Sequence, residues 1–453
     1  MKTFYLSLMC LAAALLAGCD RNDGRETGLK IYVRDSGGSR TETSVDGDGV
    51  YRVSWKAGDR ISVFVFGADA DLPLENNSPF VYDEASGAFI NESVSLSPGQ
   101  TYRYAAVYPY DAALGWGSHG SFAIPEIQTQ QAENPLAHLS GLDCLIGETR
   151  TAGVPSIPMS HLGAMLRVTL HNPSGASRLV ESLSVHIDGV ELSGGQEIDF
   201  AAGAFVANPS PAVATGVTLA FDRPVEVAPG AEYDGYLMVA PRRIDGAAAT
   251  ISIVTDAGIF TETRTLSDVE FAAGTVNDAR FELTGAPVLA RWSGEGTHAF
   301  PFAAAVGNGT LRVVGGVSET VTCSAGEVKY LDWSPVGYGE EMYWQAEVPA
   351  AVAPGDRFVV GFSVFGEKFS PRDWRVQASV DGVGWTELGT YAVTATTAAS
   401  AEPHSFGYLP AEAGERLFFR LCPEGDVSVN DDIVDARNGA SALVGLTVSR
   451  GGE

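Results

Sequence analysis

The sequence predicts an all-β protein built from β-sandwiches, and two observations carry this prediction. Apolar and polar residues alternate along many short stretches, such as 29–34 and 374–381, and a period of two places alternate side chains on opposite faces of a strand. Short turn sequences separate these stretches, such as Ala-Gly-Asp at 57–59 and Ala-Pro-Gly at 353–355, as sandwiches require. The segment 130–139 is a weak helix candidate, because a proline interrupts it.

The composition is that of a globular protein. The 453 residues are 45% hydrophobic and 19% charged, which excludes overall disorder and leaves room for about three domains. The formal net charge of −27 gives an acidic surface that repels phosphate backbones, so we expect no nucleic-acid partner. Cys144, Cys323 and Cys422 are far apart and odd in number, so we expect small buried hydrophobes rather than a disulfide framework or a zinc site.

The N-terminus resembles a bacterial lipoprotein signal peptide. Lys2 precedes an apolar run over 4–17, and Leu-Ala-Gly at 16–18 leads directly to Cys19. The run is shorter than the roughly 20 apolar residues of a membrane span. The resemblance implies that residues 1–18 are removed and that Cys19 is lipidated. The alternative is an ordinary secretory signal followed by an incidental cysteine.

A polar segment and three blocks follow the signal. Residues 19–28 are expected to form a tether, and their acidic character resembles that of lipoproteins exported to the outer face of the outer membrane. This implies a surface-exposed outer-membrane lipoprotein. We expect blocks at 29–158, 159–284 and 285–453, because Gly-Ala-Pro at 285–287 marks a linker and the third block holds five of the seven tryptophans.

The first two blocks carry motifs of a known family. Residues 55–64, 104–110 and 161–168 resemble, in order and spacing, the signature blocks of fimbrillin-like proteins, and 271–276 is similar to the close of the family's second domain. These proteins are lipoprotein precursors of type V pili and related surface adhesins. The resemblance implies two tandem sandwiches of transthyretin-like topology, in which the motif residues have structural roles.

The resemblance also implies a route of assembly. In polymerising members an arginine-specific protease removes the first strand, and a strand of another pilus subunit fills the groove by β-augmentation. Here the first strand is expected over 29–34, and Arg40, in a Gly- and Ser-containing segment, is the candidate cleavage site. The alternative is that no cleavage occurs. A whole further block follows the fimbrillin-like region, which favours a tip, accessory or non-polymerising protein over a stalk subunit.

The third block resembles galactose-binding-like jelly rolls, the discoidin and carbohydrate-binding sandwiches. A tryptophan strand runs into Ser-x-Asp-Gly-x-x-Trp over 374–385. Trp374 and Trp385 are expected in core or hairpin packing. The best candidates for sugar contact are aromatic residues in a loop-rich stretch, with core packing as the alternative: Trp333, Tyr338, Tyr343 and Trp344.

Few sequence motifs indicate catalysis or the binding of a cofactor or metal. The GxGxxG pattern at 115–120 has no βαβ unit around it, and His161, before an apolar strand, is expected to be structural. The acidic run over 424–435 lacks EF-hand spacing, so a solvated loop is favoured over a calcium site. We therefore expect no enzyme, no cofactor and no metal, although a carboxylate pair drawn from distant strands would leave no local pattern.

Two functions remain open. The first is a non-enzymatic fimbrial tip or accessory subunit, or adhesin, whose partners are other pilus subunits. The alternative is a surface lipoprotein that binds a glycan or a host surface glycoprotein and serves nutrient uptake.

Overall fold

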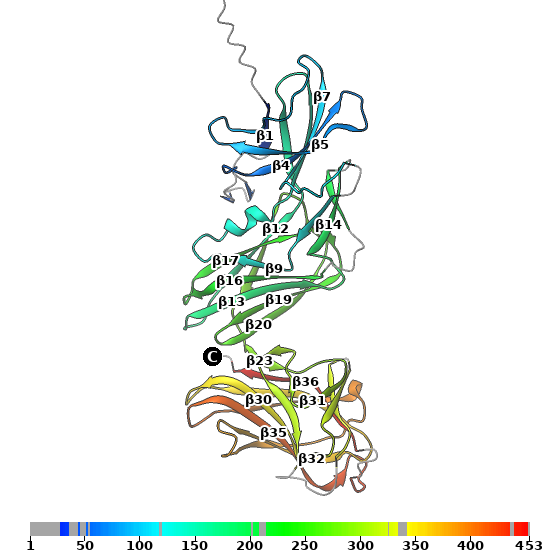
Figure 1. Ribbon diagram of the computed structural model, residues 1–453. Helices are drawn as coiled ribbons and strands as arrows, with labels where there is room; N and C mark the ends of the chain where they lie inside the picture. Colours follow the sequence, from blue (N-terminus) through cyan, green and yellow to red (C-terminus); the bar gives the residue numbers. More distant parts are fainter. Residues whose placement is uncertain are drawn as a thin grey trace, which may run out of the picture.

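The protein is described by a computed structural model over 28–35, 44–45, 51–52, 55–116, 120–200, 203–207, 214–324, 326–333, 342–434 and 439–451. Within these ranges the elements are strands, apart from two 3-10 helices, η1 (Ala137–Gly141) and η2 (Ala398–Ser400). The all-β prediction is confirmed. The weak helix candidate over 130–139 is a strand end, a loop and the start of η1. Figure 1 shows three bodies stacked along the chain.

The first body is a closed barrel in the order β1-β11-β10-β7-β4-β5-β6. Its core includes Ile31, Val63 and Phe89, which are wholly buried. The expected first sandwich closes into a barrel because β1 pairs on both sides, with β6 and with β11. The strands are β1 (Leu29–Asp35), β4 (Arg60–Gly67), β5 (Pro73–Asp83), β6 (Ala88–Asn91), β7 (Tyr102–Tyr108), β10 (Leu145–Thr151) and β11 (Ser156–His161), with a separate pair β2 (Ser44–Val45) and β3 (Tyr51–Arg52).

The second body packs sheets around one core that includes Leu183, Leu219 and Leu237. Strands before and after residue 159 build it, because β8 pairs with β14 and β9 pairs with β16. The chain thus crosses to the second body and returns to the barrel at β10. The strands are β8 (Gly120–Ile124), β9 (Ile127–Gln130), β12 (Ala164–His171), β13 (Arg178–Ile187), β14 (Gly194–Asp199), β15 (Ala204–Ala207), β16 (Gly216–Val227), β17 (Glu232–Val239), β18 (Arg242–Ile244), β19 (Ala247–Thr255), β20 (Gly258–Leu266), β21 (Val269–Phe271) and β22 (Val276–Glu282).

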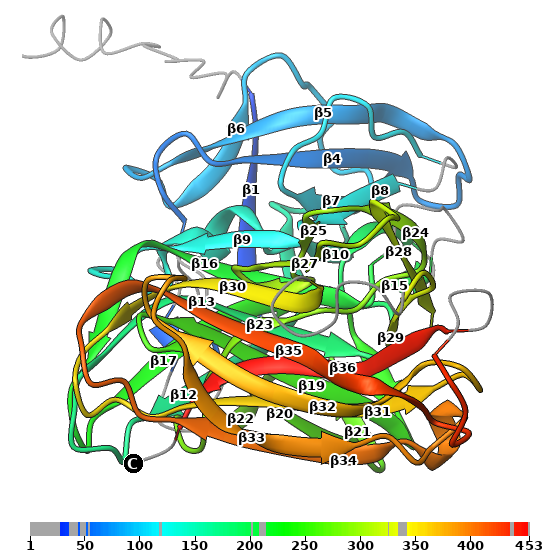
Figure 2. The same cartoon turned by 90° about the horizontal axis from the view of Figure 1, so that it is seen from below.

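The third body, the C-terminal sandwich, has two layers. One is the sheet β25-β27-β30-β35-β32-β33, of which Figure 2 labels β30, β35, β32 and β33. The other contains β24, β28, β29, β36, β31 and β34 and continues through β23 into the second body. The strands are β23 (Val288–Arg291), β24 (Gly296–Ala299), β25 (Phe302–Ala303), β26 (Val306–Gly307), β27 (Thr310–Val314), β28 (Thr320–Ser324), β29 (Glu327–Tyr330), β30 (Tyr343–Val352), β31 (Phe358–Gly366), β32 (Pro371–Ser379), β33 (Thr386–Ala392), β34 (Glu402–Tyr408), β35 (Gly414–Ser428) and β36 (Ser441–Arg450).

The last strand of the chain is enclosed by its own sheet. β36 pairs with β29 and β23 on one side and with β31 on the other. Its side chains Leu443, Leu446 and Val448 are at most 1% exposed. This strand therefore completes the C-terminal sandwich.

Candidate functional site

The first strand, β1, closes the barrel through short pairings. Leu29–Ile31 pair antiparallel with β6, and Tyr32–Asp35 pair parallel with β11. Ile31 is wholly buried, and Leu29 and Val33 pack against the same core while staying partly exposed. Arg40 lies in sequence between β1 and β2, outside the described residues, as does Cys19.

Beneath β1 the barrel wall is apolar. Phe89 on β6 and Ile157 and Met159 on β11 are wholly buried. Removal of β1 would take one of two neighbours from each strand, leaving β6 paired with β5 and β11 paired with β10. A hollow of about 740 Å³ already flanks β1, lined by Tyr32 and Val154 among other residues. Without β1, the edges of β6 and β11 that now pair with it would be open, and strand addition uses such backbone edges together with apolar side chains beneath them.

The signature motifs pack against one another in and beside this barrel. Trp55 contacts Phe89 and Tyr108 edge to face, with ring centroids 4.9 and 5.0 Å apart. His161 at the end of β11 is buried, and its Nδ1 lies 2.8 Å from the Asp143 carboxylate. Burial and a close carboxylate fit the expected structural role of His161.

The expected sugar-binding cluster is wrong for two of its four residues. Trp333 and Trp344 are wholly buried, so neither ring offers a face to a ligand. Trp333 Nε1 donates to Ser441 Oγ at 2.6 Å, and its ring contacts Trp344 and Trp374 at 6.0 and 5.0 Å. Both indoles belong to the core of the C-terminal sandwich. Trp374 is 1% exposed, as its predicted core packing requires.

The other two members of the cluster differ. Tyr338 lies outside the described residues. Tyr343 is partly exposed on β30, with its ring centroid 5.3 Å from the guanidinium carbon of Arg420. Arg420 also lies over the Trp385 ring, at 4.1 Å.

The sequence analysis missed the polar residues beside Tyr343. Gln345, Arg420 and Gln377 are direct neighbours across β30, β35 and β32. The alternation in Arg416-Leu417-Phe418-Phe419-Arg420 could have placed Arg420 on the outer face. That Trp385 covers it depends on how the 380–385 turn folds back, which has no local sequence signal.

The acidic run over 424–435 is partly engaged by arginines. Glu424 lies 3.4 Å from Arg375, and Asp431 pairs with Arg372. No group of three or more potential metal ligands occurs in the part of the chain that the structure describes. No helix within those ranges is long and apolar enough to cross a membrane.

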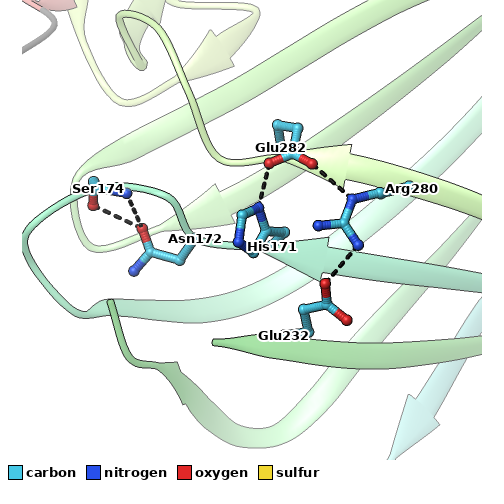
Figure 3. A network of polar contacts seen from close by, with 6 residues as sticks. All are labelled: His171, Asn172, Ser174, Glu232, Arg280 and Glu282. Carbon is cyan, nitrogen blue, oxygen red and sulfur yellow. Dashed lines mark hydrogen bonds and ion pairs between the residues drawn. The ribbon is translucent and has the colours of Figure 1, made fainter. Parts of the chain in front are cut away.

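A polar network ties three strands of the second body together (Figure 3). His171 on β12 and Arg280 on β22 both contact the Glu282 carboxylate, and Arg280 also pairs with Glu232 on β17. Separately, Asn172 accepts hydrogen bonds from Ser174. The hydrogen bond from His171, then that from Arg280, lowers the pKa of Glu282 below its ordinary value of 4.5. The contacts of His171, Arg280, Glu282 and Glu232 lie within β22 or between neighbouring strands and indicate a structural role.

We expect Glu282→Gln to destabilise the second body above pH 4.5, by an amount that shrinks as the pH falls below 4.5. A lowered folded-state pKa contributes stability that is fully present above the unfolded-state value and is lost as the pH falls through the folded-state value. Thermal midpoints of both proteins from pH 3 to 7 measure this, with Glu226→Gln, an exposed position on β16, as control. A difference between wild type and variant that stays constant with pH would contradict the prediction.

The sequence model of a family described as fimbrillin-like matches residues 42–295, and no curated protein sequence matches significantly. Among solved structures, the chain is similar to a protein assigned to cell adhesion from Bacteroides ovatus, with 16% identity, a TM-score of 0.40, and coverage of 56% of this chain and 91% of that chain.

Two further structures are similar. A fimbrial protein from Bacteroides vulgatus has 11% identity and a TM-score of 0.31, with 56% of this chain and 95% of that chain covered. A xylan-binding module has 13% identity and a TM-score of 0.24, with 35% of this chain and 97% of that chain covered. The family match spans more than half of the 453 residues and includes the motifs at 55–64, 104–110, 161–168 and 271–276. The chain belongs to the fimbrillin-like family.

Proposed function

We propose that this protein is a cell-surface lipoprotein that serves as a tip or accessory subunit of a fimbria, or as an adhesin, and joins other pilus subunits by donor-strand addition. Family membership supports a non-enzymatic fimbrial or adhesive role. The observation that carries the finer proposal is the place of β1: the first strand of the barrel, joined on both edges, over an apolar wall.

Cleavage at Arg40 would free β1 from the rest of the chain. The cut falls after the barrel's first strand, so the segment holding Leu29, Ile31 and Val33 could then leave as one piece. An incoming strand would regain the backbone hydrogen bonds to β6 and β11 and place alternate side chains over Phe89 and Ile157. A groove of this kind selects partners by their side chains at every second position.

A second candidate is binding of a glycan at the cell surface, as part of adhesion or nutrient uptake. Trp333 and Trp344 do not support glycan binding, because both are buried. The observation that favours it is the outer face of β30, β35 and β32, where the partly exposed rings of Tyr343 and Trp385 flank Arg420. Partly exposed rings can pack against the C–H groups of a sugar, and the planar polar groups beside them can form hydrogen bonds with its hydroxyls.

Immunogold electron microscopy of intact cells tests the main proposal, with Cys19→Ala as its control. We expect label on the cell surface or at fibre ends. A lipid on Cys19 holds the protein at the membrane, so the Cys19→Ala variant should pass into the medium. Regular labelling along the fibres would contradict the tip or accessory role, and a variant that stays with the membrane would contradict the anchor.

A further inference from the structure

We propose that the outer face of β30, β35 and β32 binds a sugar that carries a single carboxylate, with Arg420 as the residue that recognises it. This inference rests on the glycan-binding candidate above and names its ligand class.

Three polar side chains form a row on this face. Gln345, Arg420 and Gln377 lie directly opposite one another on adjacent strands. The preceding or following residues in each strand point into the core, so these three point outward. They are nevertheless only 7%, 9% and 9% exposed, and the rings of Tyr343 and Trp385 lie against Arg420 and shield it.

Two aromatic rings hold the guanidinium of Arg420. The ring centroids of Trp385 and Tyr343 lie 4.1 and 5.3 Å from its central carbon. Cation–π contacts of this kind fix the orientation of an arginine that is largely shielded from water. The side chain is therefore positioned before any ligand arrives, which lowers the entropic cost of binding.

The charge of Arg420 is uncompensated within the described ranges. Its one hydrogen bond there runs from Nε to Gln377 Oε1, at 2.7 Å, and no carboxylate pairs with it. By contrast, Arg416 on the same strand pairs with Glu347, and Arg375 on β32 pairs with Glu424. A shielded charge without a counter-ion is costly. A carboxylate would accept two parallel hydrogen bonds from a guanidinium and remove that cost.

The surroundings favour a sugar with one charge over a polyanion. The amide of Gln345 makes no hydrogen bond to any described residue and is available to a hydroxyl, and the flanking rings suit sugar C–H groups. The net charge of −27 repels a polyanionic chain. At physiological salt, charges more than about 8 Å away are largely screened, so a single carboxylate beside Arg420 is repelled much less. An acidic peptide is the competing occupant, and the test below separates it.

The experiment applies the full chain to immobilised oligosaccharides that end in glucuronic or N-acetylneuraminic acid. The same oligosaccharides with the carboxyl group reduced to an alcohol, and a glutamate-rich peptide, complete the panel. We expect binding to at least one acidic sugar and a loss of about tenfold or more on reduction, because a charged hydrogen-bond pair is removed. Arg420→Met should show the same loss, and Arg416→Met, on the same strand and face, should bind as wild type does.

Each other result overturns the inference. Equal binding of acidic and reduced sugars would reject the carboxylate but leave the glycan candidate standing. Binding of the peptide alone, or of nothing, would reject both. Because Arg420 is shielded, Arg420→Met is checked for folding by near-ultraviolet circular dichroism. Gln345→Ala removes an amide with no hydrogen bond inside the described ranges, and unchanged sugar binding by this variant would also reject the site.

Discussion

Replacing Trp333 with alanine is expected to lower the free energy of unfolding of the C-terminal sandwich by about 3–5 kcal/mol. The indole is wholly buried and contacts Tyr330, Trp344 and Trp374 edge to face. Its removal would leave a large cavity and would also leave Ser441 Oγ without the hydrogen bond that Trp333 Nε1 donates.

Denaturant unfolding followed by tryptophan fluorescence measures this effect, since five of the seven tryptophans lie in this body. Three bodies need not unfold together, so the transition of the sandwich is analysed separately. Trp333→Phe keeps the ring packing and should lose clearly less than the alanine variant. A loss below about 1 kcal/mol for Trp333→Ala would mean that the indole is not a core residue.

Trp333 and Trp344, which were predicted to contact a sugar, are buried. They show how far local sequence can predict the place of a side chain. In 343–348, Trp344, Ala346 and Val348 alternate with Tyr343, Gln345 and Glu347, so the period of two could have turned Trp344 inward and Tyr343 outward. Trp333 precedes no such alternation and lies outside the strands. Only the packing of distant strands around it shows that it is buried.

The topology of the sheets could be predicted from the sequence only in part. The strand over 29–34 follows from alternation, and β1 begins where expected. Its parallel pairing with β11 joins residues more than a hundred positions apart, and no local pattern encodes such a contact. The crossing of β8 and β9 into the second body is likewise a long-range pairing. Local sequence therefore predicted strands and motifs, but not which edges meet.

Cleavage at Arg40 is expected to produce a barrel that accepts a strand without producing homopolymers. A homopolymer needs each copy to donate a strand, and donation of β36 would be costly. Its Leu443, Leu446 and Val448 are at most 1% exposed, and burial of each contributes about 1.5–3 kcal/mol. Withdrawal of β36 would also break its pairing with β29, β23 and β31.

Limited trypsin treatment of purified protein, followed by electrophoresis in SDS without heating, tests this expectation. Wild type should lose the segment that contains β1 and remain a single band, and Arg40→Gln should keep the segment. A regular ladder of homo-oligomers from wild type would show that the chain is a stalk subunit.

The asymmetry between the two ends of the chain is the physical basis of the expected result. β1 contributes Ile31 as its one wholly buried side chain among the described residues, with Leu29 and Val33 only partly buried. β36 lies between strands on both sides and contributes several wholly buried side chains. We therefore expect replacement of β1 by a donor strand to cost less than donation of β36, which would dismantle the C-terminal sandwich. On the same grounds we expect the chain to accept one strand, to donate none and to lie at one end of a fibre.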